Sequence, residues 1–210
     1  MNKIVNYKQY SKEDLFNIIR NTSIKGDSSV FPFSDFKLSV QTISQEDLIP
    51  TQTFVFNDQI KLIQNLVRQF SKLGIDLFSL NGFVSFKTLA TQQGGQNEIR
   101  KIAEEFVYSI PIVEVIEGAP LIIDGMHRAT VAGKKKIPFN ALFIENVPEH
   151  LYPYQLPLSG GWSAVKQFKN KLPDGFSRKE RRYPDGFHKY YFCDYPFPGI
   201  IKLAREHTGK

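Results

Sequence analysis

Cysteine is almost absent from this sequence, and long apolar runs are missing. The single cysteine, Cys193, excludes an internal disulfide and any metal site built from several cysteines, so we interpret it as a small buried residue. No apolar run approaches the roughly 20 residues that a membrane-spanning helix needs. The first residues also lack the apolar stretch of a signal peptide. We therefore expect a cytoplasmic protein with no membrane partner.

Acidic residues become scarce toward the C-terminus. Residues 163–210 contain 11 Lys and Arg but only 5 Asp and Glu, so the whole formal net charge of +6 falls in this segment, together with nine Phe and Tyr. Such a segment suits nucleic acid, a nucleotide, a phosphorylated substrate or a merely adhesive surface, and it excludes none of them. The overall hydrophobic content of 41% is typical of a folded soluble protein.

The length of 210 residues allows one core with an appendage. We expect an N-terminal helix and loop over residues 1–36, a core over 37–150, and a basic aromatic extension over 151–210 that packs on the core. Ser11 followed by Asp14 predicts a capped helix that contains Leu15, Ile18 and Ile19. Alternating apolar residues predict a strand over Lys37–Ile43.

Periodicity predicts most of the elements that follow. A helix capped by Asn57 should end at Gly74. Residues 75–90 favour a small hairpin, with short helices as the alternative, and the Gly-rich tract 92–96 favours a loop. Further patterns predict a helix over 97–108, strands over 111–116, 120–124 and 139–144, and a helix that follows Met126 and ends near Gly133.

The stretch Leu121–Ala132, LIIDGMHRATVA, combines a strand, a glycine turn and the start of a helix. A helix N-terminus attracts anions through its N–H groups and its dipole. Arg128 would add a planar guanidinium that can donate to two phosphate oxygens, and His127 would add a further donor. Gly125 would let the backbone come close to the phosphate. Asp124 could hold a metal ion or accept a proton. The alternative is an ordinary turn in which Asp124 is only an N-cap and Arg128 a solvated charge.

The motif Asp124–Arg128 and the order of elements from Leu38 to Val147 resemble the ParB/sulfiredoxin-like superfamily, with an apparent insertion at 75–96. The resemblance covers about half the chain. It implies an α/β (α+β) fold with a small mixed sheet and packed helices. In this superfamily the matching motif contacts nucleotide phosphates, which implies that role for Gly125, Met126, His127 and Arg128.

The chain differs from these relatives at two functional positions, and the differences limit the reactions that it could catalyse. Sulfiredoxins have a reactive cysteine where this chain has Met126, so repair of oxidised cysteine is not expected. Free-serine kinases resemble the chain most closely in function, because they share the aspartate at Asp124. Their catalytic glutamate corresponds to Gln52 here, which cannot act as a base. Glu46 or Asp124 would have to substitute, while Thr51 and Gln52 are candidate phosphate contacts.

Two turn signals mark the C-terminal segment, where PDGF at residues 173–176 returns at 184–187. Between them lie four basic residues that could contact a substrate or nucleic acid: Arg178, Lys179, Arg181 and Arg182. The alternative is a solvated charged face over an aromatic extension. Unlike partition proteins, the chain has no convincing recognition helix after Val147.

The preferred hypothesis is a nucleotide-dependent phosphotransferase that acts on a small hydroxyl-bearing molecule or a protein side chain. It would use ATP or ADP, with CTP as the alternative, together with Mg²⁺ held by Asp124. Asp124 or Glu46 would orient or deprotonate the acceptor. A DNA- or RNA-binding protein or nuclease is the second hypothesis, and a nucleotide-gated module without turnover is the third.

Overall fold

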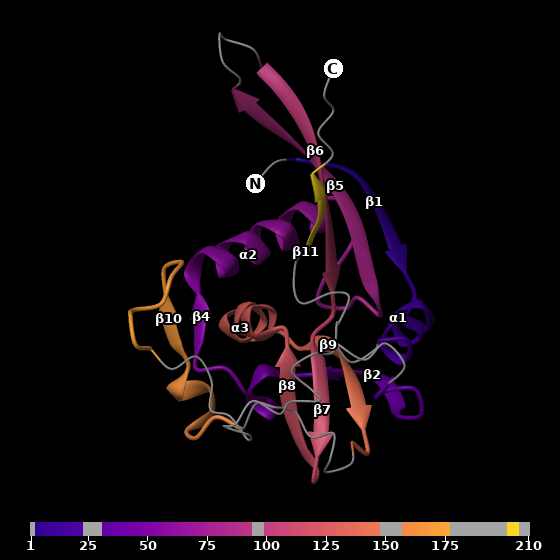
Figure 1. Cartoon of the computed structure of the whole chain (residues 1–210), viewed down its shortest axis with the longest axis vertical. Helices are drawn as coiled ribbons and strands as arrows, with labels where there is room; N and C mark the ends of the chain where they lie inside the picture. The colour runs from indigo at the N-terminus through magenta and orange to yellow at the C-terminus, as the bar shows by residue number, and fades with distance from the viewer. Residues whose placement is uncertain (1–2, 23–30, 94–98, 148–156, 177–200, 206–210) are drawn as a thin grey trace.

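The computed structural model describes residues 3–22, 31–93, 99–147, 157–176 and 201–205, and Figure 1 shows how the elements are arranged. In chain order the elements are β1 (Ile4–Tyr10), α1 (Lys12–Arg20), β2 (Lys37–Ile43), η1 (Gln45–Asp47), β3 (Ile49–Pro50), β4 (Phe54–Phe56), α2 (Asn57–Ser71), β5 (Phe83–Gln93), β6 (Ile99–Ser109), β7 (Ile112–Ile116), β8 (Ala119–Asp124), α3 (Met126–Lys135), β9 (Phe139–Glu145), η4 (Gly161–Ala164), β10 (Lys166–Phe168) and β11 (Ile201–Arg205).

A five-stranded mixed sheet forms the base of the fold, with the strand order β2-β9-β7-β8-β3. β9 runs parallel to β7 and antiparallel to β2, while β8 runs antiparallel to β7 and parallel to β3. The central strand β7 and its neighbour β9 are almost wholly buried, as continuous apolar runs predict. The expected α+β fold with a small mixed sheet is confirmed.

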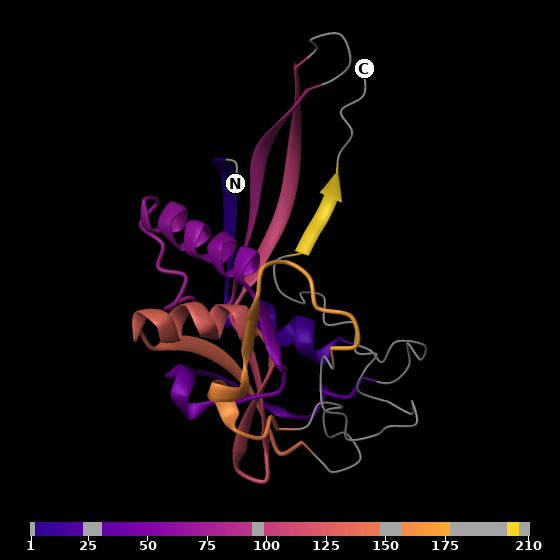
Figure 2. The ribbon, with the colours of Figure 1, turned by 90° about the vertical axis from the view of Figure 1, so that its left-hand side faces the viewer.

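Helices α2 and α3 lie together beside this sheet (Figures 1 and 2). The buried side of α2 carries Ile60, Ile63, Leu66 and Phe70, at the spacing that the sequence predicts. The helix ends before Gly74, which has a φ of +78°. Its start differs from the prediction, because the N-cap is Phe56 and no side chain caps the helix.

A second, antiparallel sheet has the order β1-β5-β6-β11, and its strands β5 and β6 project from the rest of the molecule (Figure 2). The predicted helix over 97–108 is wrong, because β6 occupies Ile99–Ser109 and pairs with β5 along its whole length. Apolar residues here recur at helical spacing, but the segment also contains Ile, Phe, Val and Tyr, which suit a strand. Pairing across the sheet overrides the helical pattern.

The hairpin predicted within 75–90 is also wrong. Only the part from Phe83 onward is a strand, and its partners are β1 and β6. The tract 92–96 begins in β5 and continues into residues outside the described ones.

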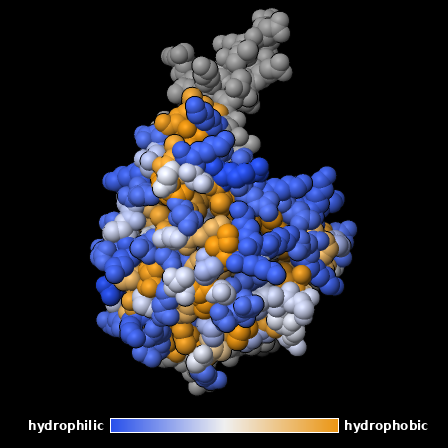
Figure 3. Space-filling model, turned by 180° about the vertical axis from the view of Figure 1, so that it is seen from behind, coloured by the Kyte–Doolittle hydropathy of each residue, from blue (hydrophilic) through white to orange (hydrophobic). Residues whose placement is uncertain are grey.

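On the back of the molecule, hydrophobic residues gather along the middle among a mostly hydrophilic surface (Figure 3).

The N-terminal helix α1 begins as predicted. The Ser11 hydroxyl accepts a hydrogen bond from the Asp14 N–H at 3.1 Å, and the Asp14 carboxylate accepts one from the Ser11 N–H at 2.9 Å. This reciprocal capping box satisfies two N–H groups that the helix itself cannot. Leu15 and Ile19 then anchor α1 in the core.

Helix α3 ends at Lys135, near Gly133 as the sequence predicts. Gln45 packs against Gly133, where a Cβ would lie 1.6 Å from the Gln45 Oε1 atom, so there is no room for a side chain at this position. The C-cap of the helix is Lys136, which has a left-handed φ of +54°. Among the described residues, no helix is both long and apolar enough to cross a membrane.

Residues 157–176 run along the β3–β4 segment. The Leu158 N–H donates to the Pro50 carbonyl at 2.8 Å, and the indole Nε1 of Trp162 donates to the Leu48 carbonyl at 2.7 Å. β10 then pairs with β4 as a two-stranded parallel sheet. This part of the extension therefore covers the strand that leads into α2.

Candidate functional site

The candidate site lies where β8 ends and α3 begins. The pairing of β7 with β8 shifts there, since Val113 faces Ile122 but Ile112 faces Asp124, which makes Ile123 an extra residue. Such a bulge re-aims the neighbouring side chain. Gly125 follows with a φ of +100°, and a Cβ on it would lie 2.7 Å from the Pro111 Cβ. Only glycine fits this turn without strain.

The first turn of α3 has no capping side chain and no acidic residue. The first hydrogen bond within the helix runs from the Ala129 N–H to the Gly125 carbonyl at 2.9 Å. The N–H groups of Met126, His127 and Arg128 therefore have no acceptor inside the helix. The alternative that Asp124 merely caps the helix is wrong, because the N-cap is Gly125. An anion at the turn would meet these three N–H groups.

Arg128 is buried, with 3% of its side chain exposed. Its guanidinium forms an ion pair with Asp124 and donates to both the carbonyl and the hydroxyl of Ser109, the hydroxyl contact being 3.0 Å. It also lies 5.7 Å from the centre of the Tyr108 ring. The second part of the alternative, a solvated Arg128, is therefore wrong. Arg128 ties the turn to the end of β6.

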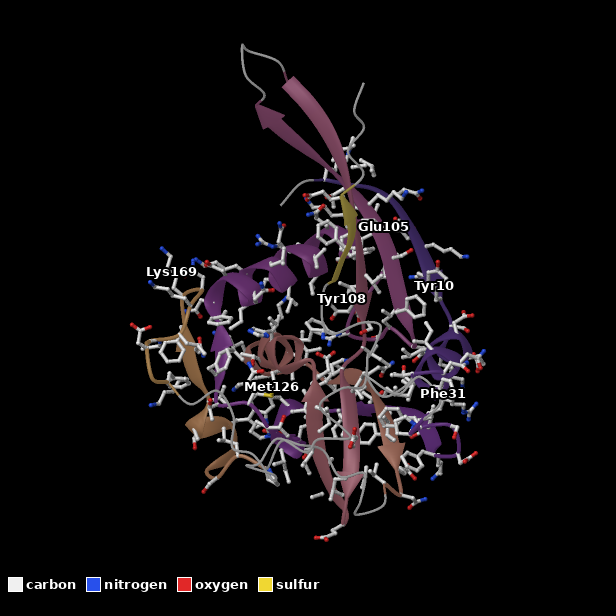
Figure 4. The ribbon with its side chains drawn as sticks, in the orientation of Figure 1. Tyr10, Phe31, Glu105, Tyr108, Met126 and Lys169 are labelled. Atoms are coloured by element: carbon white, nitrogen blue, oxygen red, sulfur yellow. The ribbon has the colours of Figure 1, made fainter. Side chains whose placement is uncertain are left out.

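Tyr108, labelled in Figure 4, is buried in the interior, and its ring faces this guanidinium. Burial raises the pKa of its hydroxyl to about 12, and the nearby Arg128 charge opposes that rise only in part. The hydroxyl therefore stays protonated at every physiological pH. Tyr108 contributes a neutral wall to the Arg128 site, and Asp124 supplies the compensating charge.

His127 is neutral at physiological pH. Burial is the main cause that lowers its pKa to about 4, the Arg128 charge lowers it further, and Asp124 opposes both. Its Nε2 atom accepts the Phe56 N–H at 2.9 Å, so the ring proton must lie on Nδ1. The imidazole also lies nearly parallel to the Phe56 ring, with centroids 6.2 Å apart. The donor expected from His127 is thus Nδ1–H.

A cavity of about 100 Å³ opens beside this turn. Its lining residues come from three elements and the connections between them: Gln52, Gln59, Ile63, Ile123, Asp124, Gly125, Met126, His127 and Arg128. The sequence gives no sign of the part played by Gln59 and Ile63, because their helical pattern indicates only packing. The cavity is smaller than the roughly 300–1,000 Å³ typical of sites for whole organic ligands, and its size suits a phosphoryl group.

The structure brings most of the predicted site residues together, but not all of them. Gln52 lines the cavity, and its side-chain amide donates to the Phe54 carbonyl at 2.6 Å. Thr51 is buried and donates to the Ile122 carbonyl at 2.7 Å, so it joins β3 to β8. Glu46 is exposed in η1 and does not line the cavity. Arg178, Lys179, Arg181 and Arg182 lie outside the described residues.

Few side chains at this site could bind a divalent cation. The described residues contain no group of three or more His, Cys, Asp or Glu side chains that could hold a metal ion. Asp124 is the one carboxylate in the cavity lining, and one of its oxygens accepts a hydrogen bond from Arg128. Mg²⁺ commonly uses one carboxylate, waters and substrate phosphates. Asp124 therefore fits Mg²⁺ only as an ion that arrives with a phosphate.

The fold is thus a mixed-sheet α+β domain in which a glycine turn and a helix without a capping side chain follow strand β8. Comparison with known proteins adds the family: the model described as the ParB CE domain matches residues 14–166. The chain belongs to the ParB CE family. The match begins in α1 and ends at the first residue of β10. Searches of curated proteins and of solved structures gave no significant match.

Proposed function

We propose that this ParB-like protein binds a nucleoside di- or triphosphate, ATP or ADP first and CTP as the alternative, with one phosphate at the start of α3. The observation that carries the proposal is the uncapped first turn beside a cavity of about 100 Å³. Anions are favoured at such an N-terminus by its N–H groups and its dipole, and the effect grows where water is excluded. The family assignment agrees with the proposal but does not require it.

The side chains at the turn support an anion in different ways. The Nδ1–H group of His127 is a neutral donor, and neutrality at pH 7 spares the site the cost of a second buried charge. Arg128 contributes a positive charge that Asp124 already balances. A phosphate would therefore share Arg128 with Asp124, and most of the attraction would come from the backbone.

We further propose that the bound nucleotide serves as a phosphoryl donor to a hydroxyl-bearing small molecule or protein side chain. The acceptor oxygen would bond to the terminal phosphorus while the bridging P–O bond breaks, the bond's electron pair would stay on the bridging oxygen of the departing nucleotide, and the hydroxyl proton would pass to Asp124. Mg²⁺, when bound with the nucleotide, neutralises charge on the phosphates. Such transfer depends mainly on positioning, so no covalent nucleophile is needed. Glu46 has no part in this scheme because it lies outside the cavity.

Calorimetric titration tests the binding step. ATP, ADP and CTP are each titrated with Mg²⁺ into the wild type and into Gln59→Glu, which places a negative charge in the cavity lining. The matched control is Gln64→Glu, the same change on the same helix but outside that lining. We expect Gln59→Glu to weaken binding by roughly tenfold or more and Gln64→Glu to leave it unchanged. No binding by any nucleotide would contradict the proposal.

Mass spectrometry then separates transfer from binding alone. The protein is incubated with the nucleotide that binds and with a panel of amino acids and sugars, and products are examined for a gain of one phosphate. Gln52→Glu is measured in parallel, because it restores an acid where free-serine kinases have their base. Transfer by the wild type supports the phosphotransferase proposal. Transfer by Gln52→Glu alone would identify the natural chain as a nucleotide-gated module.

A further inference from the structure

A second cavity, of about 470 Å³, lies beside the candidate phosphate site. Phe54 and Phe56 of β4 form one wall, and the loop Asn170–Phe176 forms the other. Ligand cavities in proteins typically measure roughly 300–1,000 Å³, so this one has the size for a small organic group. Phe176 lies beyond the residues that match the ParB CE model. The chain therefore completes this cavity with residues outside the family match.

We infer that this cavity holds the base of the nucleotide whose phosphate lies at the start of α3. The inference rests on the proposed function. The phosphate cavity, at about 100 Å³, is smaller than the roughly 300–1,000 Å³ typical of sites for organic ligands, so we place the base and sugar of a bound nucleotide outside it. The rings of Phe54, Phe56 and Phe176 line this second, aromatic cavity together with polar groups, and bases stack on aromatic rings.

The linings of the two cavities meet at one pair of residues. Phe56 lines the aromatic cavity and His127 lines the phosphate cavity, and these two residues are in direct contact. The Phe56 N–H lies 2.9 Å from His127 Nε2, and their rings are 22° from parallel. A ligand that reaches across this pair would place a phosphate on one side and a planar ring on the other. A nucleotide joins these two groups through a single sugar.

The aromatic cavity is preformed by ring-to-ring contacts. Phe176 meets Phe168 edge to face with centroids 4.9 Å apart, and it meets Phe54 in the same way at 6.2 Å. The Lys166 ammonium lies 5.5 Å from the centre of the Phe176 ring. Such pairs hold a ring in one orientation, so little ordering remains to be done when a ligand stacks on it.

The backbone also fixes the loop that carries Phe176. The Asp58 N–H at the start of α2 donates to the Lys169 carbonyl at 3.1 Å. The turn predicted at 173–176 is confirmed, since the Phe176 N–H donates to the Pro173 carbonyl at 3.2 Å and Gly175 has a φ of +72°. Exposed lysines on this segment, including Lys166, Lys169 and Lys171, also favour an anionic ligand.

The test compares MgATP with magnesium tripolyphosphate, which has the phosphates but no base. Calorimetry is performed on the wild type, on Phe176→Ala, and on Phe31→Ala as a control. Phe31 is 42% exposed and lies on the opposite side of the molecule from Lys169, the residue before the loop (Figure 4). We expect the wild type to prefer MgATP. Phe176→Ala should lower the affinity for MgATP by roughly five- to one-hundred-fold and leave the affinity for tripolyphosphate unchanged. Phe31→Ala should bind both ligands as the wild type does.

A second variant keeps the result independent of any folding defect. Phe176→Trp preserves a stacking surface and adds a fluorophore, so MgATP should quench its emission while tripolyphosphate should not. Equal affinity for MgATP and tripolyphosphate, with no effect of Phe176→Ala, would overturn the inference and leave the phosphate site standing. Failure of both ligands to bind would overturn the proposed function as well. If Phe176→Ala weakens the binding of a single-stranded oligonucleotide but not the binding of MgATP, the cavity binds nucleic acid and the inference is wrong.

Discussion

Acid should destabilise this protein through His127. The pKa of the ring is about 4 in the folded chain and about 6.5 when it is unfolded. Between these values the unfolded chain binds a proton that the folded chain does not, so stability falls as pH drops from 6.5 to 4 and this loss levels off below 4. A difference of about 2.5 pKa units corresponds to about 3 kcal/mol in the free energy of unfolding.

The matched variant is His127→Gln. The Gln side chain supplies an oxygen that can accept the Phe56 N–H, but it does not titrate. Urea denaturation of both proteins at pH 7.5 and pH 4 separates His127 from the carboxylates, whose titration is common to the two. The wild type should lose about 3 kcal/mol more than the variant. Equal losses in the two proteins would refute the account of a neutral, buried His127.

Three further changes test the packing around the site by urea denaturation at pH 7.5. Gly125→Ala should lower the free energy of unfolding by roughly 2–4 kcal/mol, because it adds a clash with Pro111 to the strain of a positive φ. Gly118→Ala has the same strain but open space around it, so it should lower the free energy of unfolding by only about 1 kcal/mol. Similar losses in the two variants would contradict this reasoning. Arg128→Met should cost roughly 3–5 kcal/mol by leaving a carboxylate without its buried partner, and a neutral effect would show that the ion pair is dispensable. Trp162→Phe loses one hydrogen bond and should cost about 1 kcal/mol, while no change would indicate that the extension does not stabilise β3.

Local signals in the sequence predict the elements whose causes are local. The capping box at Ser11 and the turn at residues 173–176 depend on contacts within four residues, and both form as predicted. Strand β2 likewise follows from its alternating pattern. These features need no knowledge of the rest of the fold.

Features that depend on distant residues could not be predicted in this way. The helical spacing of residues 97–108 is overridden by pairing with β5, which begins 16 residues before β6. The absence of a side chain at Gly133 in α3 is likewise explained by Gln45, far away in sequence, which occupies the space beside it. In both cases the reason is a tertiary contact that no local pattern shows.

The candidate site likewise has features that local sequence predicts and features that depend on distant residues. The order of strand, glycine turn and helix at Asp124–Arg128 is readable from the sequence, and the structure has it. The partners of these side chains are not readable, because Ser109 and Phe56 approach from other elements. The sequence therefore predicts where an anion could lie, but it does not predict that Arg128 is already paired.

The most direct test of the phosphate site is the response of three backbone amides to nucleotide. In two-dimensional ¹H–¹⁵N NMR spectra, MgATP should shift the amide signals of Met126, His127 and Arg128 most strongly, because these N–H groups would donate to the phosphate. Magnesium tripolyphosphate should shift the same three signals. If MgATP binds and leaves these three amides unmoved while others shift, the phosphate does not lie at the start of α3 and the central claim is wrong.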